Sequence, residues 1–125
     1  MPLSVDPPLV AVALTAGGEF SSLATEGRRC AVSILVRDQE FLSERFAGRA
    51  PVPDPAFTGV PNELDAHAVP VLSGATAAVS GEVVSRTTYG DHDLVVIAID
   101  SGELAPDEDD PLLSYEGAYR SLEVG

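Results

Sequence analysis

The stretch "TTYGDHDLVVIAID", residues 87–100, joins a polar corner to a continuous apolar run. The run 93–100 is rich in β-branched residues and has the length of a buried β-strand. The preceding segment, 75–87, alternates between apolar and polar residues for much of its length, which is typical of a half-buried antiparallel strand. The two strands are close enough in sequence to pair as a hairpin, with His92 at its mouth.

Other apolar runs predict further strands. "PPLVAVAL" at 7–14 and "CAVSILV" at 30–36 have the length and composition of buried strands, and residues 111–125 could supply one last strand with a frayed tail. These segments make about five strands joined mostly by hairpins or loops, which favours a small β-barrel over an α/β sheet. The fold class expected is therefore mainly β.

Two short helices are expected beside the strands. "RDQEFLSERFAGR" at 37–49 has a helical apolar face, with Asp38 as the expected N-cap and Gly48 as the glycine that ends the helix. A second helix is expected near residues 21–28, capped by Ser21 or Ser22. Residues 49–70 hold five prolines and no clear period, so they are expected to form a long loop of the kind that often binds ligands.

The composition bounds the function. The 125 residues, 1–125, are expected to form one domain. The chain has 20 acidic and 7 basic residues, and every basic residue is an arginine. The lack of lysine excludes lysine Schiff-base chemistry and a P-loop lysine, and the net charge of −13 argues against nucleic-acid binding. The five acids of 101–111 are expected to lie in a solvated loop.

The single cysteine and the apolar pattern bear on location. Cys30 cannot form an internal disulfide, which fits a reducing cytoplasm. No stretch has the roughly 20 apolar residues of a membrane span. The first ten residues have no basic leader and contain Asp6-Pro7-Pro8, so a signal peptide is not expected.

His92 is the sharpest chemical candidate, because a histidine beside a carboxylate can be held in one tautomer and used as a donor or acceptor near neutral pH. The pattern alone still favours an ordinary histidine in a surface turn. His67 is expected to be a loop residue. The two histidines and one cysteine are widely spaced, so no metal site is predicted.

Two further patterns stay open from spacing alone. Ser43, Arg45 and Arg49 could contact a phosphate, but the segment also fits an ordinary amphipathic helix, which the spacing favours. Tyr115 and Tyr119, four residues apart, could cover a planar ligand or pack at an edge.

Taken in order, these segments resemble the flavin reductase-like family, the FMN-binding split barrels that supply reduced flavin to two-component monooxygenases. The resemblance runs from residue 4 to about residue 122. It is carried by "SVDPPLVAVAL", "CAVSILVRDQEFLSERFAG", "PVLSGATAAVSGEVVSRTTYGDHDLVVIAID" and "PLLSYEGAYRSL", with a glycine-rich turn and short helix between the first two.

The resemblance implies a fold and an activity. The fold would be a split β-barrel, a Greek-key-like small barrel with two short helices. The activity would be hydride transfer from NAD(P)H to FMN or FAD, with a monooxygenase as the partner. At the corner, Gly90 would permit the turn, Asp91 would orient the imidazole and His92 would face the nicotinamide.

The resemblance also implies a set of flavin contacts and an incomplete barrel. Family members carry a further N-terminal segment with two strands before the Asp-Pro-Pro motif, and a Ser/Thr pattern where this chain has "TAGGEF". A barrel lacking two strands exposes backbone edges, which favours a homodimer. A non-catalytic flavin-binding dimeric barrel is therefore the rival expectation. The cofactor-binding residues implied are Ser43, Arg45 and Phe46 at the flavin's phosphate end, and Tyr119 near the site.

Overall fold

The computed structural model describes residues 1–46, 61–64, 69–75, 77–104, 113–115 and 118–120. Among these residues there are nine strands and two short α-helices, so the predicted mainly β class is confirmed. The chain divides into two compact units. One comprises Met1–Val32 and Val79–Gly102, and the other comprises Ser33–Ala78 and Glu103–Gly125.

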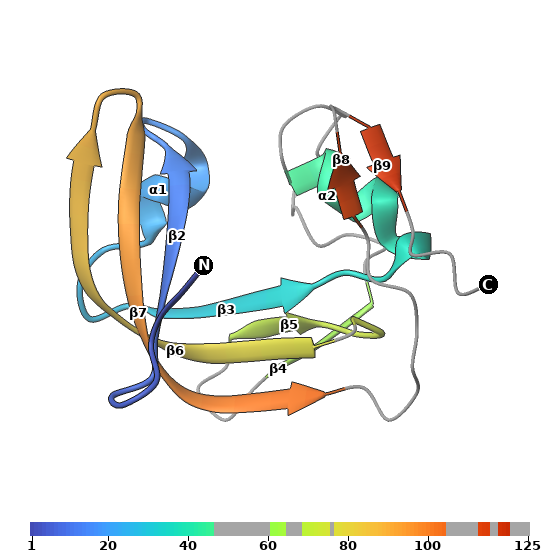
Figure 1. The fold of residues 1–125 in the computed structure, drawn as a ribbon, viewed down its shortest axis with the longest axis horizontal. Coiled ribbons are helices and arrows are strands. Elements are labelled where there is room, and N and C mark those ends of the chain that lie inside the picture. The colour runs from blue at the N-terminus through green and yellow to red at the C-terminus, as the bar shows by residue number, and fades with distance from the viewer. Residues whose placement is uncertain (47–60, 65–68, 76, 105–112, 116–117, 121–125) are drawn as a thin grey trace. The chain divides into compact units, whose positions relative to one another are not determined.

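A five-stranded sheet dominates the first unit (Figure 1). Its order is β1 (Pro2–Ser4), β2 (Leu9–Thr15), β7 (His92–Leu104), β6 (Ala77–Tyr89) and β3 (Arg29–Ile34). β6 and β7 are each 13 residues long and continue beyond the first unit. The predicted hairpin is confirmed and is longer than expected. Its strands are separated by only Gly90 and Asp91, so His92 is the first residue of β7.

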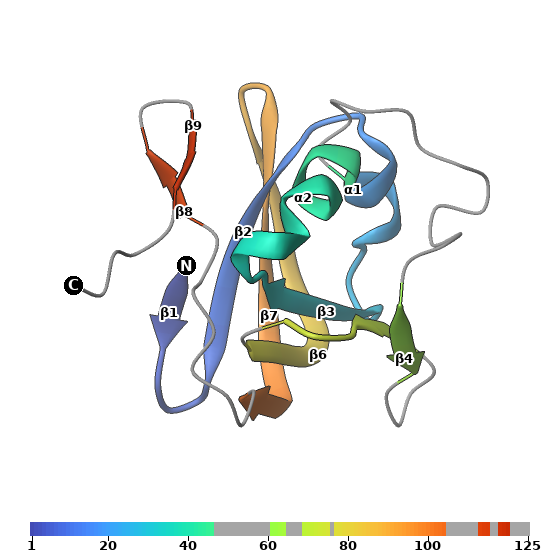
Figure 2. The same ribbon diagram turned by 90° about the vertical axis from the view of Figure 1, so that its right-hand side faces the viewer.

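The core of this unit lies between the sheet and helix α1 (Glu19–Leu23), which covers one face of the strands (Figure 2). Val83, Val95 and Ile97 are almost fully buried, and they pack with Ala24 just after the helix. The partly buried side chains around them are Val12, Leu14, Cys30, Val32 and Ile99. Aliphatic side chains therefore build the core.

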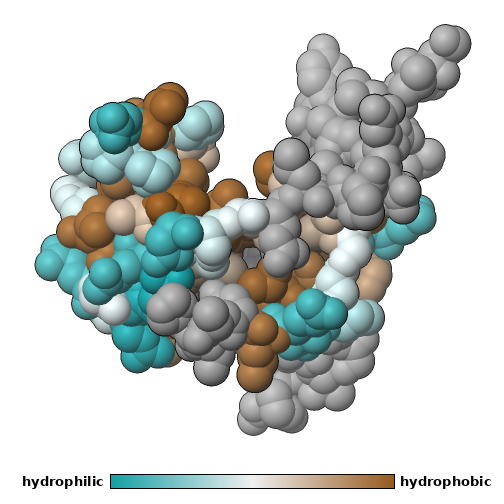
Figure 3. All heavy atoms as spheres, turned by 90° about the horizontal axis from the view of Figure 1, so that it is seen from below, coloured by the Kyte–Doolittle hydropathy of each residue, from teal (hydrophilic) through white to brown (hydrophobic). Residues whose placement is uncertain are grey.

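Apolar side chains also reach the surface of this unit. Phe20, Leu23 and Val84 are among the exposed large apolar residues, and brown apolar surface is interspersed with teal hydrophilic surface on the left of Figure 3. None of the helices in the described part of the chain is long and apolar enough to span a membrane.

Helix α1 begins earlier than the sequence predicts, and its predicted cap is wrong. The N-cap residue is Gly18, which has no side chain that could cap the helix. The helix starts directly after a turn in which the Gly18 amide donates to the Thr15 carbonyl at 3.1 Å. Ser22 Oγ donates to the Glu19 carbonyl, while Ser21 is buried and its hydroxyl contacts another part of the fold.

Strand β6 departs from simple alternation. Gly81 and Val83 are buried and Glu82 is exposed, as the pattern predicts, but Ser80 is also buried. Burial of this hydroxyl is tolerated because its Oγ atom lies 2.6 Å from Ser101 Oγ, where the two hydroxyls share a hydrogen bond.

The second unit contains helix α2 (Glu40–Phe46), preceded by a 3₁₀ turn at Arg37–Gln39. The predicted helix is therefore confirmed in part. Asp38 lies within the 3₁₀ turn and not at an N-cap, and Gly48 lies outside the described residues. Leu42 anchors the helix, since it is only 2% exposed.

Gln39 fixes the start of α2. Its Oε1 atom accepts from the Val36 amide at 3.1 Å, and its Nε2 atom donates to the Ser73 carbonyl at 2.8 Å. Ser73 follows β5 (Pro70–Leu72), so one amide side chain joins the turn after this strand to the helix. The glutamine of the family-like "DQEFLSERF" motif thus has a structural role.

Two short hairpins complete the described elements. β4 (Asn62–Leu64) pairs antiparallel with β5, so this part of the expected 49–70 loop is a strand. Pairing with β5 explains the difference, because the neighbouring strand supplies backbone partners that a local pattern does not show. β8 (Leu113–Tyr115) pairs with β9 (Ala118–Arg120) where one last strand was expected.

Candidate functional site

The corner between β6 and β7 has a backbone that favours glycine. Gly90 has φ +61°, in the left-handed region that other residues adopt at a cost. The corner is held against the end of β2. The Ala16 amide donates to the Asp91 carbonyl at 2.9 Å, and Thr15 is the pairing partner of His92.

The side chains of Asp91 and His92 meet at this corner. His92 Nδ1 lies 2.8 Å from Asp91 Oδ1, and the two side chains are 51% and 96% exposed. The hydrogen bond to His92, followed by the imidazole charge, lowers the pKa of Asp91. Because a carboxylate only accepts hydrogen bonds, Nδ1 carries the proton and Nε2 is an acceptor when the ring is neutral. The corner therefore presents a solvent-accessible imidazole of defined tautomer.

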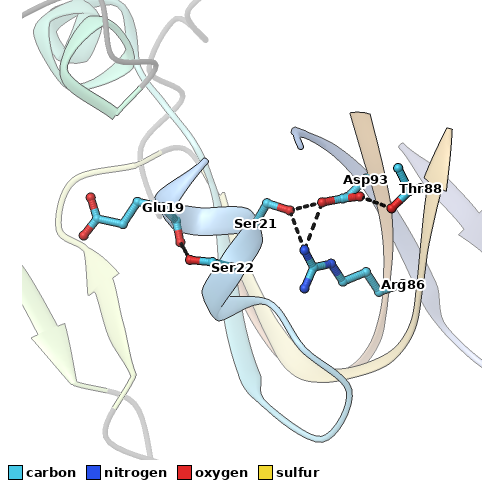
Figure 4. Close-up of polar contacts among 6 residues, drawn as sticks. All are labelled: Glu19, Ser21, Ser22, Arg86, Thr88 and Asp93. Carbon is cyan, nitrogen blue, oxygen red and sulfur yellow. Dashed lines mark hydrogen bonds and ion pairs between the residues drawn. The ribbon is translucent and has the colours of Figure 1, made fainter. Parts of the chain in front are cut away.

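A polar cluster is centred on the carboxylate of Asp93 (Figure 4). Asp93, the residue after His92, is 2% exposed. Its carboxylate accepts hydrogen bonds from the hydroxyls of Ser21 and Thr88, and from Arg86 Nη2 at 3.0 Å. Arg86 Nη2 also donates to Ser21 Oγ at 3.1 Å.

This cluster keeps the Asp93 carboxylate ionised. The hydrogen bond from Ser21, followed by those from Thr88 and Arg86, lowers the pKa of Asp93 from its ordinary value of 3.8 to about 2. Reasoning from the sequence missed the cluster. The available signal was an aspartate at the first buried position of the apolar run 93–100, where an acid needs partners.

The other predicted site residues belong to the second unit. Ser43 is half-buried in α2. Arg45 and Phe46 lie in the same helix and Tyr119 lies in β9, but their side chains are outside the described part of the structure. The structure thus brings together Gly90, Asp91 and His92.

Two further predictions concern His67 and a metal site. His67 lies outside the described residues. Among the residues that are described, no group of three histidine, cysteine or acidic side chains is placed to hold a metal ion.

Comparison with known proteins identifies the family. The family model described as "Flavin reductase like domain" matches residues 1–123. The chain belongs to the flavin reductase-like family. The resemblance inferred from the sequence motifs is thereby confirmed, and it covers both units of the structure.

Two curated relatives illustrate the similarity of this flavin reductase-like chain. An NADH-dependent flavin reductase of Rhodococcus sp. is 35% identical over 122 residues, which is 98% of this chain and 65% of the relative. HsaB, the reductase subunit of a flavin-dependent monooxygenase of Mycobacterium tuberculosis, is 32% identical over 126 residues, which is 97% of this chain and 64% of the relative. The chain thus spans just under two thirds of the length of each.

A solved structure agrees with these sequence matches. The structure of the flavin reductase PheA2 in its native state superposes with a TM-score of 0.83 at 32% identity, and the match covers 98% of this chain and 76% of that one. This similarity confirms the predicted fold class, a mainly β fold of the flavin reductase barrel type.

Proposed function

We propose that this chain is a flavin reductase that transfers a hydride from NAD(P)H to FMN or FAD. The observation that carries the proposal is the exposed Asp91–His92 pair, held on a glycine corner in a chain that matches the family over residues 1–123. The flavin, when bound, supplies the ring that accepts two electrons and a proton as hydride; a second proton comes from solvent. The protein's part is to hold and align the two ring systems.

His92 and Asp91 are assigned to the nicotinamide. Hydrogen bonding to Asp91 fixes the His92 tautomer, so Nε2 can accept a hydrogen bond from the amide nitrogen of a nicotinamide carboxamide. Gly90 permits the turn that presents the pair to solvent. Asp91 acts through the imidazole and His92 contacts the cofactor.

The flavin is assigned to residues of the second unit. The Ser43 hydroxyl and the Arg45 guanidinium have the chemistry that a flavin phosphate requires, and Phe46 follows them in α2. We assign Tyr119 of β9 to the same site. These assignments rest on the family resemblance and on the donor groups that the two elements carry.

The setting of the reaction is part of the same proposal. The matched range 1–123 supports one flavin reductase-like domain made of both units. We place the chain in the cytoplasm as a homodimer that passes reduced flavin to a monooxygenase. The relative HsaB, a monooxygenase reductase subunit, supports such a partner.

The proposal is tested by binding and turnover. The purified chain is titrated with FMN and with FAD, followed by flavin fluorescence, and NADH oxidation is then measured at 340 nm with saturating flavin. Saturable flavin binding with flavin-dependent NADH oxidation is the expected result. Binding without turnover would instead indicate the non-catalytic flavin-binding barrel. A folded chain that binds no flavin would overturn the proposal.

A further inference from the structure

Asp93 lies next to the proposed nicotinamide contact but does not share its exposure. It is 2% exposed, whereas the His92 side chain is 51% exposed. Neighbouring residues of a strand point to opposite faces of the sheet, so His92, the first residue of β7, faces outward and Asp93, the second, faces inward. Contacts within the fold can therefore fix the position of Asp93.

The donors to Asp93 come from two different elements. Ser21 belongs to α1, while Arg86 and Thr88 belong to β6 (Figure 4). The carboxylate itself is buried, so losing these donors would leave a charge without hydrogen bonds at a site where little water reaches it. The start of β7 is therefore locked to both the helix and the neighbouring strand.

The other side of the corner is held by β2. The Ala16 amide donates to the Asp91 carbonyl at 2.9 Å, and Thr15 pairs with His92. Ala16 begins the short connection between β2 and α1, and Ser21 lies in α1, so both anchors of the corner come from one segment of the chain. A shift of α1 would move the corner through Asp93.

We propose that Asp93 is a positioning residue for nicotinamide binding: its hydrogen-bonded cluster with Ser21, Arg86 and Thr88 holds the Asp91–His92 pair in the orientation that receives the cofactor. This inference rests on the proposed function of the corner. A displacement of about 1 Å can reduce a rate by about a hundredfold, so the support matters as much as the contact.

Three substitutions test this role. Each removes a charge or a donor of the Asp93 cluster and leaves Gly90, Asp91 and His92 unchanged. Asp93→Asn keeps the size and removes the charge, while Ser21→Ala and Thr88→Val each remove one donor. The matched control is Asp100→Asn, because Asp100 lies on the same strand and also pairs with an arginine, Arg29, at 2.8 Å between Nη2 and Oδ1. Thermal unfolding of each variant shows which are folded.

The first readout needs no ligand. NMR signals of the His92 imidazole are recorded in the purified chain and assigned with a His67→Ala background. We expect Asp93→Asn to shift these signals toward those of Asp91→Asn, with Asp100→Asn leaving them in place. His92 signals that stay unchanged in Asp93→Asn would overturn the inference. If Asp93→Asn does not fold, the same comparison with Ser21→Ala and Thr88→Val decides.

The second readout is kinetic. We expect KM for NADH to rise on the order of tenfold in Asp93→Asn and less in Ser21→Ala, with the flavin Kd unchanged and Asp100→Asn like wild type. An equal rise of KM for NADH in Asp100→Asn would show that Asp93 stabilises the fold in general and does not position His92. A wild-type chain that shows no flavin reduction defeats the proposed function, and the NMR comparison still decides whether Asp93 positions His92.

Discussion

A Cβ atom added to Gly81 of β6 would lie 1.8 Å from the carbonyl oxygen of Ala98 in β7. The obstacle is backbone and not a flexible side chain, so the two strands approach as closely as they do only because residue 81 is a glycine. The hairpin that carries the corner thus depends on Gly81, which lies within β6 and away from the corner.

Gly81→Ala should therefore destabilise the fold strongly. We expect the free energy of unfolding to fall by more than about 2 kcal/mol, because the strands must separate to admit the methyl group. Urea denaturation followed by circular dichroism measures the change. Gly17→Ala is the control: Gly17 has φ +78° but no atom within 4 Å of its added Cβ, so only backbone strain of about 1 kcal/mol is expected. Equal losses of unfolding free energy in Gly81→Ala and Gly17→Ala would contradict the predicted clash.

Removing the imidazole should change the acidity of its partner. The pKa of Asp91 is lowered chiefly by its hydrogen bond with His92 and by the imidazole charge, so His92→Ala should raise this pKa toward its ordinary value of 3.8. Carboxyl ¹³C NMR titration measures the shift, and His67→Ala should leave Asp91 unaffected. An Asp91 that titrates alike in all three proteins would show that the pair does not form in solution.

The buried carboxylate of Asp93 should make stability depend on pH. The folded-state pKa of Asp93 is about 2, below its ordinary value of 3.8, so the unfolded chain binds this proton more readily. Its contribution to stability is complete above about pH 4 and is lost as the pH falls toward about 2. Between pH 5 and pH 3, the urea midpoint should therefore fall further in wild type than in Asp93→Asn. Parallel losses in the two proteins would contradict the assignment.

The lone cysteine should react slowly in the folded chain. Cys30 packs against the core, and burial raises the pKa of its thiol more than the charge of Arg28 lowers it. Because the thiolate is the reactive form, labelling by a disulfide reagent at pH 8 should be at least about tenfold slower than in guanidinium chloride. Equal labelling rates under the two conditions would mean that Cys30 is not protected.

The hairpin and its corner could be predicted from the sequence because their signals are local. An apolar run, an alternating run and an intervening Gly90-Asp91 are all visible within 30 residues. Helix α2 could also be predicted from a local signal, since Leu42 and its apolar neighbours repeat with helical spacing. The family resemblance then implied a role for His92 in nicotinamide binding, which periodicity alone did not indicate.

The elements that escaped prediction depend on partners far away in the chain. Ser21 looked like a helix cap, but its hydroxyl bonds to Asp93, 72 residues later. β4 lay in a proline-rich stretch and is a strand only because β5 pairs with it. In both cases the deciding contact is non-local, so no pattern within a short window could have shown it.

The measurement that tests the central claim most directly is the rate of NADH-dependent flavin reduction by wild type, His92→Ala and His67→Ala at saturating flavin. If the corner binds the nicotinamide, kcat/KM for NADH should fall by about tenfold or more in His92→Ala, through loss of a positioned contact. His67→Ala should match wild type, and flavin affinity should be equal in all three. Equal kcat/KM for NADH in active wild-type and His92→Ala proteins would contradict the account.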